Sequence, residues 1–301
     1  MKRNLPLSTC AIVAALITSG SATVTMDWVT IGDINNAADP LTGYGSVDHA
    51  YRIGKYEVTN AQYGEFLNAK GQSNANGIYH QFMSNYGITQ TGSSGSYSYT
   101  VTSALANRPV VYVSWLGAAR FANWMVNGQG NGNMENGAYT LNGATGGIIL
   151  ANAGAQVYIP SENEWYKAAY YNAANSSYSL YPNGQNTIAT EDANYNSRAS
   201  TDVGTYAGDP SFYGTFDQGG NVWEYNDAII EIPEYPGYLL RGLRGGSSFH
   251  GEIGLAAYSR DRVSSGNEDR YNGFRLATVP EPTSIVLSMF AGGMMLIRRK
   301  R

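Results

Sequence analysis

Thiol groups are almost absent from this 301-residue chain, whose only cysteine is Cys10. That cysteine lies in an N-terminal apolar stretch that we expect to be removed, so the mature protein has no thiol. Disulfide bonds are then excluded, and so is any chemistry that needs a protein thiolate. A domain of this size can bury enough apolar surface to fold without disulfides.

Charged residues are also scarce, at 14% of the chain. Six of the 19 Lys and Arg residues and one of the 23 acidic residues lie in the two terminal segments, which leaves 13 basic and 22 acidic residues in positions 23–280. A net charge near −9 argues against nucleic acid or an anionic membrane surface as the partner. The 36 glycines and 24 tyrosines indicate an ordered, loop-rich α+β or β domain, because disordered chains are poor in aromatic residues.

The N-terminus has the pattern of a secretory signal peptide. A basic pair at positions 2–3 precedes an apolar stretch over 5–17, and small residues at 20–22 suit a signal peptidase. The apolar part is too short for a permanent membrane-spanning helix. The residue before Cys10 is a threonine, larger than a lipoprotein signal allows, so we expect no lipidation. The sequence predicts a signal peptide over residues 1–22.

The C-terminus carries Val279-Pro280-Glu281-Pro282, an apolar run over 283–297 and the basic end Arg298-Arg299-Lys300-Arg301. As a helix, the apolar run would reach about 22 Å, against a hydrocarbon core of about 30 Å. The basic end would stay on the cytoplasmic side. A generic tail anchor is one interpretation. The order of the three parts resembles the PEP-CTERM sorting signal over residues 279–301. That resemblance implies an inner-membrane intermediate, cleavage by an exosortase, and release to the cell surface or extracellular matrix of a Gram-negative-type bacterium.

The central part contains a few clear element signals. Alternation over 48–56 predicts a strand. Thr59 and Gln62 form a capping box that opens a helix ending near position 70. A second helix is expected from Ser114 to about position 128, where a glycine would cap it. Ser161 and Glu164 form another capping box, fed by a short strand over 157–159.

Long polar stretches separate these elements. Residues 87–107 and 127–154 are rich in Gly, Ser and Asn, and we interpret both as surface insertions on one domain covering residues 23–278. From position 204 onward there is almost no helix signal. This second half is expected to consist of irregular loops held on a small sheet.

Five motifs then occur in order: Tyr56-Glu57-Val58-Thr59-Asn60; Arg108-Pro109-Val110 with Val113-Ser114-Trp115; Ile159-Pro160-Ser161-Glu162-Asn163-Glu164-Trp165; Phe216-Asp217-Gln218-Gly219-Gly220-Asn221-Val222-Trp223-Glu224; and Arg244-Gly245-Gly246-Ser247 with Gly273-Phe274-Arg275. Together they resemble the formylglycine-generating, sulfatase-modifying family over about residues 46–277. The resemblance implies an α+β fold of the C-type-lectin-like variant, with little regular secondary structure, a small antiparallel sheet and about three helices.

The same resemblance makes the catalytic centre doubtful. Active members of the family oxidise a substrate cysteine with O₂ and copper, which two cysteines hold after the Gly-Gly-Ser motif. The matching positions here are His250 and Leu255. A soft Cu(I) site needs paired thiolates, so we expect no copper. His250, His49 and His80 have no second ligand at metal spacing and are interpreted as ordinary surface or loop histidines.

The family's calcium sites are better preserved. One would use the Asp217 side chain with the carbonyls of Gln218, Gly220 and Val222, an oxygen set that suits Ca²⁺. The alternative is that Asp217 only caps a glycine-rich turn. The second site would map onto Asn194 and the Tyr195 carbonyl, but its further ligands fall in a shortened stretch. Calcium is therefore predicted only as a structural ion.

The remaining motif residues favour structure over chemistry. Trp223 and Glu224 are expected in the interior. Four arginines could pin irregular loops or line a pocket for an acidic ligand, and the first role is favoured: Arg244, Arg260, Arg262 and Arg275. Ser247 lies in no nucleophile elbow, and no phosphate-binding loop is present.

Two functions remain open. The first is a non-catalytic exported protein whose aromatic and amide side chains bind a polysaccharide or a protein. The alternative is a modifying enzyme of the same family, a formylglycine-generating-type oxidoreductase or another activity, that works without the copper-binding cysteines.

Overall fold

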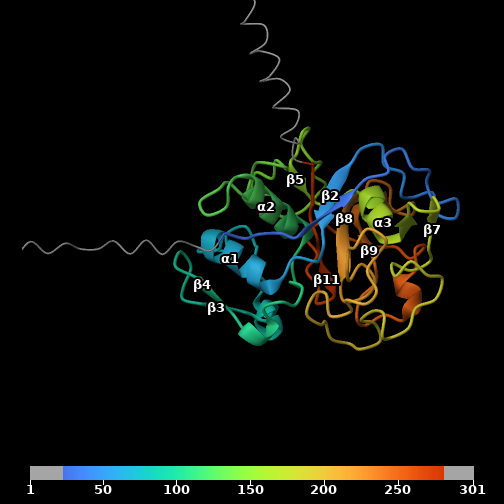
Figure 1. Ribbon diagram of the computed structural model, residues 1–301. Helices are drawn as coiled ribbons and strands as arrows, with labels where there is room; N and C mark the ends of the chain where they lie inside the picture. Colours follow the sequence, from blue (N-terminus) through green and yellow to red (C-terminus); the bar gives the residue numbers. More distant parts are fainter. Residues whose placement is uncertain (1–22, 281–301) are drawn as a thin grey trace, which may run out of the picture.

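A computed structural model describes residues 23–280. Its first sheet has the order β1 (Trp28–Ile31), β2 (Tyr51–Gly54), β12 (Ala277–Thr278) and β5 (Val157–Tyr158), with every pair antiparallel. The sheet thus joins the beginning, the middle and the end of the domain, so residues far apart in the sequence meet there (Figure 1).

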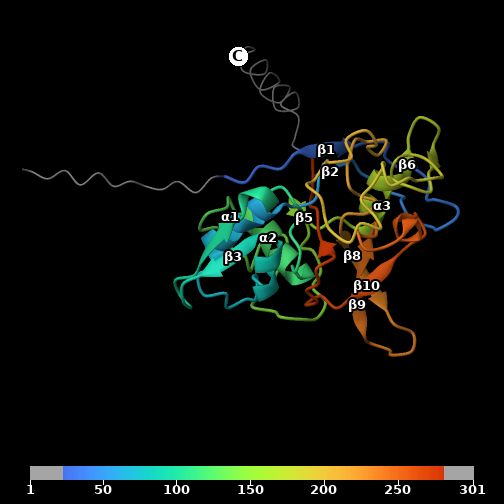
Figure 2. The same ribbon diagram turned by 90° about the horizontal axis from the view of Figure 1, so that it is seen from below.

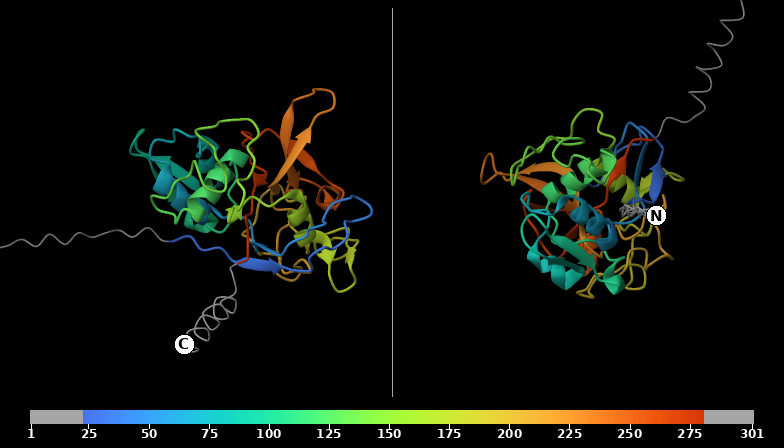
Figure 3. Two further views of the ribbon diagram at one scale, coloured as in Figure 1. Left: turned by 90° about the horizontal axis from the view of Figure 1, so that it is seen from above. Right: turned by 90° about the vertical axis from the view of Figure 1, so that its left-hand side faces the viewer.

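The second sheet belongs to the C-terminal half. Its order is β10 (Asp261–Val263), β9 (Leu239–Arg244), β8 (Trp223–Glu231) and β11 (Asn272–Gly273). β11 runs parallel to β8, and the other pairs are antiparallel. The β8–β9 hairpin extends beyond the body of the molecule (Figure 3).

Three α-helices lie in the described part of the chain: α1 (Asn60–Lys70), α2 (Trp115–Val126) and α3 (Glu162–Tyr170). The shorter elements are η1 (Gln81–Tyr86), η2 (Ser103–Leu105), η3 (Glu252–Leu255), the hairpin β3 (Ile88–Thr91)–β4 (Ser98–Val101) and the hairpin β6 (Tyr171–Asn172)–β7 (Ser177–Tyr178). Figure 2 shows α1 and α2 beside the two sheets, with α3 near β8.

The largest core cluster of the described residues includes side chains of α1 and α2, and several of its members are aromatic. Phe66 of α1 packs edge-on against Phe121 of α2 at 5.6 Å, and Phe121 packs against Phe274 at 5.7 Å. All three side chains are fully buried. Truncating one such ring costs about 3–5 kcal/mol, so this cluster fixes how the helices sit on the C-terminal half.

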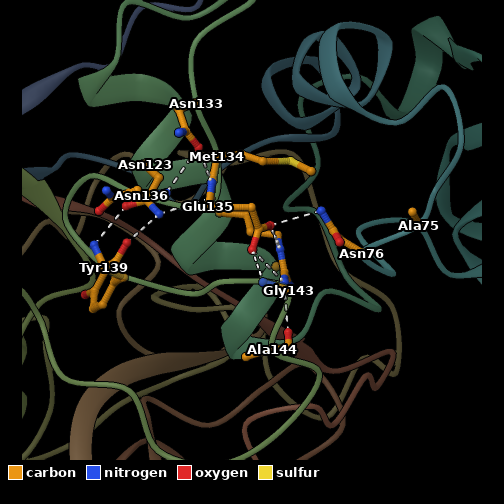
Figure 4. A network of polar contacts seen from close by, with 12 residues as sticks. Ala75, Asn76, Asn123, Asn133, Met134, Glu135, Asn136, Tyr139, Gly143 and Ala144 are labelled. Carbon is orange, nitrogen blue, oxygen red and sulfur yellow. Dashed lines mark hydrogen bonds and ion pairs between the residues drawn. The ribbon is translucent and has the colours of Figure 1, made fainter.

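The insertion over 127–154 is held by a polar network and not by a sheet (Figure 4). The fully buried Arg120 of α2 donates from Nε to Glu135 Oε1 at 2.6 Å. The other Glu135 oxygen accepts from the Gly143 amide at 2.7 Å. Asn123, also on α2, donates to the carbonyls of Met134 and Tyr139. Two polar side chains of one helix therefore anchor the loop.

The three predicted helices are confirmed with their caps. Thr59 and Gln62 exchange both capping-box hydrogen bonds, and so do Ser161 and Glu164. Ser114 caps the second helix, which closes at Asn127 and then Gly128 in the left-handed conformation (φ +81°), so the predicted glycine cap is confirmed. The α+β class is confirmed as well.

The strands differ more from the predictions. The strand expected over 48–56 is reduced to β2, because its partner β1 offers only four residues. Residues 87–107 contain a hairpin of their own. The expected small antiparallel sheet is two sheets with one parallel pair, and the half expected to be irregular contains the nine-residue β8.

The predicted signal peptide and most of the sorting signal lie outside the described residues. Within residues 23–280, no helix has both the length and the apolar character needed to cross a membrane.

Candidate functional site

The Gly-Gly-Ser loop follows β9 and requires its glycines. Gly245 has φ +94°, and a Cβ there would lie 2.6 Å from the Gln218 carbonyl oxygen. The loop leads to Ser247, whose hydroxyl lies 2.8 Å from Nδ1 of His250. The close backbone approach thus places Ser247 and His250 side by side beneath the start of η3.

His250 is half-buried, and its ring packs edge-on against Trp223 at 5.3 Å. Burial lowers the pKa of His250 below its ordinary value, which favours the neutral imidazole at pH 7. Leu255 ends η3 and is fully buried in a cluster with Tyr181 and Tyr195. One imidazole that already contacts a hydroxyl, beside a buried leucine, does not fit a Cu(I) site, which needs two thiolates.

The Asp217 loop lies between the two halves of the chain. Asp217 has φ +61°, and its Oδ2 accepts from the Gly204 amide at 2.6 Å. Burial raises the pKa of Asp217 to about 6, against the opposing hydrogen bond from Gly204. Gln218 points inward, where its amide donates to the Trp165 carbonyl at 3.0 Å. Asp217 Oδ2 therefore caps the turn, as the alternative to a calcium site predicts. Asp217 Oδ1 accepts no hydrogen bond from the described residues.

Glu57 is a candidate that the sequence interpretation missed. Its side chain is 1% exposed, and Oε1 accepts from Asn221 Nδ2 at 3.1 Å. Oε2 has no hydrogen-bond partner among the described residues. Burial raises the pKa of Glu57 well above its ordinary value, and the nearby charges of Asp217 and then Glu224 raise it further. Glu57 also lines a cavity of about 220 Å³ together with Thr59 and Gln62. An acid in the first family motif was the available signal.

The second predicted calcium site, at Asn194 and the Tyr195 carbonyl, lies next to this loop, and Asn194 is already engaged. The Asn194 carbonyl accepts from the Asn221 amide at 2.8 Å, and Asn194 forms a parallel bridge with Gly220. The Asn194 side-chain oxygen accepts from the Ser197 hydroxyl, and its amide donates to the Ala199 carbonyl at 2.9 Å. Asn194 thus supports the Asp217 loop through its hydrogen bonds.

The described residues contain no cluster of three or more His, Cys, Asp or Glu side chains that could hold a metal ion. A calcium site made of one or two carboxylates and several backbone carbonyls would not form such a cluster, because carbonyls are not side-chain ligands. The buried Glu57 oxygen without a partner fits a hard cation, which prefers oxygen ligands. The donor chemistry around Asp217 and Glu57 therefore suits calcium.

Glu224 and Trp223 lie in the interior, as expected. Glu224 is fully buried and accepts from Arg275 Nε and Nη2, each at 2.6 Å. Its Oε2 also accepts from Trp165 Nε1 at 2.7 Å. Both carboxylate oxygens are thus satisfied, and the group is part of the fold.

Three of the four arginines pin loops. Arg275 donates to the carbonyls of Gly54 and Phe216, in addition to its ion pair. Arg244 and Arg260 share the carboxylate of Glu162 at 2.7 and 2.6 Å. Arg262, on β10, is exposed, and only its backbone amide makes a hydrogen bond, to Asp261. The preference for a structural role holds for the first three.

The other two histidines differ in their surroundings. His49 Nε2 lies 3.1 Å from Glu164 Oε1, and this carboxylate raises the pKa of His49 to about 9. Glu164 also accepts from the Tyr158 hydroxyl and from the Ser161 amide, so it serves the capping box. His80 is the N-cap of η1 and accepts from the Phe82 amide at 3.2 Å. Both histidines have structural partners.

The model of the sulfatase-modifying factor enzyme 1-like domain matches residues 14–279. Two solved structures are similar: variable protein 1 of Treponema denticola (TM-score 0.58, 22% identity, 86% of this chain and 97% of that chain) and CarF (TM-score 0.59, 20% identity, 86% and 100%). No curated protein matches the sequence. At these identities the structural likeness shows the fold alone, and it confirms the C-type-lectin-like variant.

Proposed function

The chain belongs to the sulfatase-modifying factor enzyme 1-like family, and we propose that it is a binding member of that family and not a cysteine oxidase. The observation that carries the proposal is the state of the two copper positions. His250 contacts Ser247, and Leu255 is buried without any donor atom. Because Cys10 is the only cysteine, no other residue of the chain can supply the missing thiolates.

A binding role agrees with a scaffold whose structural interactions are complete. The core and its capping boxes are complete, and the ion pairs between Arg275 and Glu224 and between Arg244 and Glu162 are intact. Scaffold and catalytic groups are separable, since one fold carries many functions. An extracellular polysaccharide or protein is the proposed ligand.

The test is a direct assay for oxidation. The purified chain is incubated with Cu(I), O₂ and a peptide that carries the cysteine motif of a sulfatase, and formylglycine is measured by mass spectrometry. We expect the same yield as in the no-enzyme control. A matched variant, His250→Cys with Leu255→Cys, tests whether restoring two thiols restores copper binding. Formylglycine made by the unaltered chain would refute the proposal.

Calcium is proposed as a structural ion of this domain. Asp217 and the carbonyls of Gln218, Gly220 and Val222 would hold it, with Glu57 as a further oxygen ligand. The orphaned Glu57 oxygen and the half-buried Asp217 carboxylate support this assignment. Bound calcium would supply positive charge where these two carboxylates repel each other.

The two terminal signals support a proposed route to the cell surface. Signal peptidase would remove residues 1–22, and an exosortase would act at the Pro280-Glu281-Pro282 motif. Replacing Pro282 by alanine should leave an uncleaved, membrane-bound form, detected by fractionation and immunoblotting. A Pro282→Ala chain that is processed and exported like the parent would refute this route.

A further inference from the structure

Seven side chains form a continuous surface strip that we call the aromatic band. They come from η1 and the residue before it, from the segment before α2, and from the two loops next to β11 and η3: His80, Phe82, Tyr86, Tyr112, Phe249, Arg270 and Tyr271. Figure 1 shows η1, the short turquoise helix, and β11 both on the lower side of the molecule. The band therefore joins the N-terminal and C-terminal halves of the domain.

The first part of the band centres on Tyr112. The ring of His80 stacks on Tyr112 at 5.0 Å with an angle of 6° between the planes. Phe82 and Tyr86 contact the same ring at 5.6 and 5.4 Å. Three rings from η1 and its N-cap thus gather around one ring from the segment before α2.

The second part continues across the other half. The Arg270 guanidinium lies 4.5 Å from the centre of the Tyr271 ring. Tyr271 in turn stacks on Phe249 at 5.1 Å. Phe82 and Phe249, at the two ends of this contact path, are 46% and 47% exposed.

The backbone holds the band in a costly conformation. Tyr112 has φ +56°, in the left-handed region that bulky residues rarely adopt. Its amide donates to the Asp269 carbonyl at 2.9 Å, and Asp269 Oδ1 accepts from the Tyr271 amide at 2.9 Å. One aspartate thereby fixes the two central rings of the band. Residues held in such sparsely populated conformations cluster at active sites and ligand-binding sites.

We propose that the aromatic band binds a neutral polysaccharide chain. This inference rests on the proposed function and names its ligand class and its site. Aromatic faces stack on sugar rings, and tyrosine hydroxyls can hydrogen-bond sugar hydroxyls. A series of similar rings suits a ligand whose units repeat. The rings are already ordered by one another, so binding loses little side-chain entropy.

The charge of the domain selects against acidic polymers. Residues 23–280 carry a net charge near −9, which repels a polyanion. Arg270, the exposed cation of the band, already lies over the Tyr271 ring. A neutral polysaccharide is not repelled by this charge and does not need a free cation on the protein.

The experiment measures binding of the purified full-length chain by affinity electrophoresis in native gels. The probes are hydroxyethyl cellulose, laminarin and a galactomannan as neutral polysaccharides, with alginate and a proline-rich peptide as competitors. The test variant is Phe82→Ala with Phe249→Ala, because both side chains are half exposed. The matched control is Tyr235→Ala with Tyr238→Ala at the tip of the β8–β9 hairpin, where the two side chains are 68% and 54% exposed.

We expect at least one neutral polysaccharide to bind. The band variant should weaken that binding at least tenfold without a change in melting temperature, and the hairpin variant should stay within twofold of the parent. Binding to alginate or the peptide alone, binding to no probe, or equal binding by the band variant would each overturn the inference. The oxidation assay is independent of all these outcomes, so failure of the band and failure of the proposed function are distinguishable.

Discussion

Two buried glutamates of this domain have opposite surroundings. Glu224 and Glu57 are 0% and 1% exposed, and both lie near Arg275. Glu224 takes the guanidinium of Arg275 with both of its oxygens and also accepts from Trp165. Glu57 has one hydrogen bond from Asn221 and one oxygen without a partner. The first carboxylate completes the fold, whereas the second leaves a position that only a ligand or a proton can satisfy.

The difference shows where this domain separates scaffold from site. A buried charge is tolerated only when it is paired, because leaving water costs several kcal/mol per ion. Glu224 meets that condition within the chain. Glu57 does not: burial raises its pKa, and the acidic neighbours Asp217 and Glu224 raise it further. Three experiments test this contrast, in order of decreasing effect.

The largest effect is expected at Glu224. Glu224→Gln keeps the shape of the side chain but leaves Arg275 without a counter-charge in the interior. We expect the free energy of unfolding to fall by about 3–5 kcal/mol, measured by urea denaturation. The exposed Glu231→Gln serves as the control and should change stability by less than about 0.5 kcal/mol. A loss below about 1 kcal/mol in Glu224→Gln would show that the fold does not depend on this buried ion pair.

The second experiment adds the cation. A ligand that binds only the folded state stabilises it by RT ln(1 + [L]/Kd), so calcium at about a hundred times its Kd adds roughly 2.7 kcal/mol. For a domain of this size the melting temperature should rise by only several degrees, measured by differential scanning fluorimetry in millimolar calcium against chelator. Asp217→Ala should abolish the rise while the domain stays folded.

Glu57→Gln sharpens the same test. If Glu57 is a calcium ligand, this variant should reduce the calcium-induced rise in melting temperature. If Glu57 is a buried carboxyl that does not bind calcium, the rise should be unchanged. The exposed Glu231→Gln, which also removes one carboxylate, is the matched control. An identical melting temperature of the unaltered chain in calcium and in chelator would mean that Asp217 is a turn cap and nothing more.

The sequence predicts those parts of the molecule that depend on local interactions. The capping boxes at Thr59 and Ser161 involve residues three positions apart, and both helices begin where expected. The partner of Glu57 is 164 positions away, and the hydrogen bond to Asp217 comes from a residue 13 positions upstream. No local pattern shows that one glutamate oxygen would lack a partner.

The same limit applies to the strands and to the aromatic band. β2 is short because β1 is short, and β11 pairs in parallel with β8 after a separation of some 50 residues. Tyr112 adopts its left-handed conformation beside the distant Asp269. By contrast, the replacement of two cysteines by His250 and Leu255 is visible in the sequence itself, because it depends only on residue identity. Residue identity carries chemistry, whereas placement depends on contacts between distant segments.

The smallest effect concerns pH. Burial raises the pKa of Asp217 from 3.8 to about 6 in the folded domain. A raised carboxyl pKa means that the folded state holds its proton more tightly than the unfolded chain. Its contribution is therefore greatest at low pH and is lost as the pH rises through about 6.

In chelator, raising the pH from 5 to 7 should cost about 1 kcal/mol of unfolding free energy from Asp217 alone, measured by urea denaturation at both values. Glu57, whose pKa is also raised, acts in the same direction. Asp217→Asn should remove the Asp217 part, and saturating calcium should reverse the trend, because the ion binds the deprotonated carboxylates. If the domain in chelator is as stable at pH 7 as at pH 5, ionisation of Asp217 does not lower the free energy of unfolding. The difference between Glu224 and the Asp217 loop would then lie only in their hydrogen bonds.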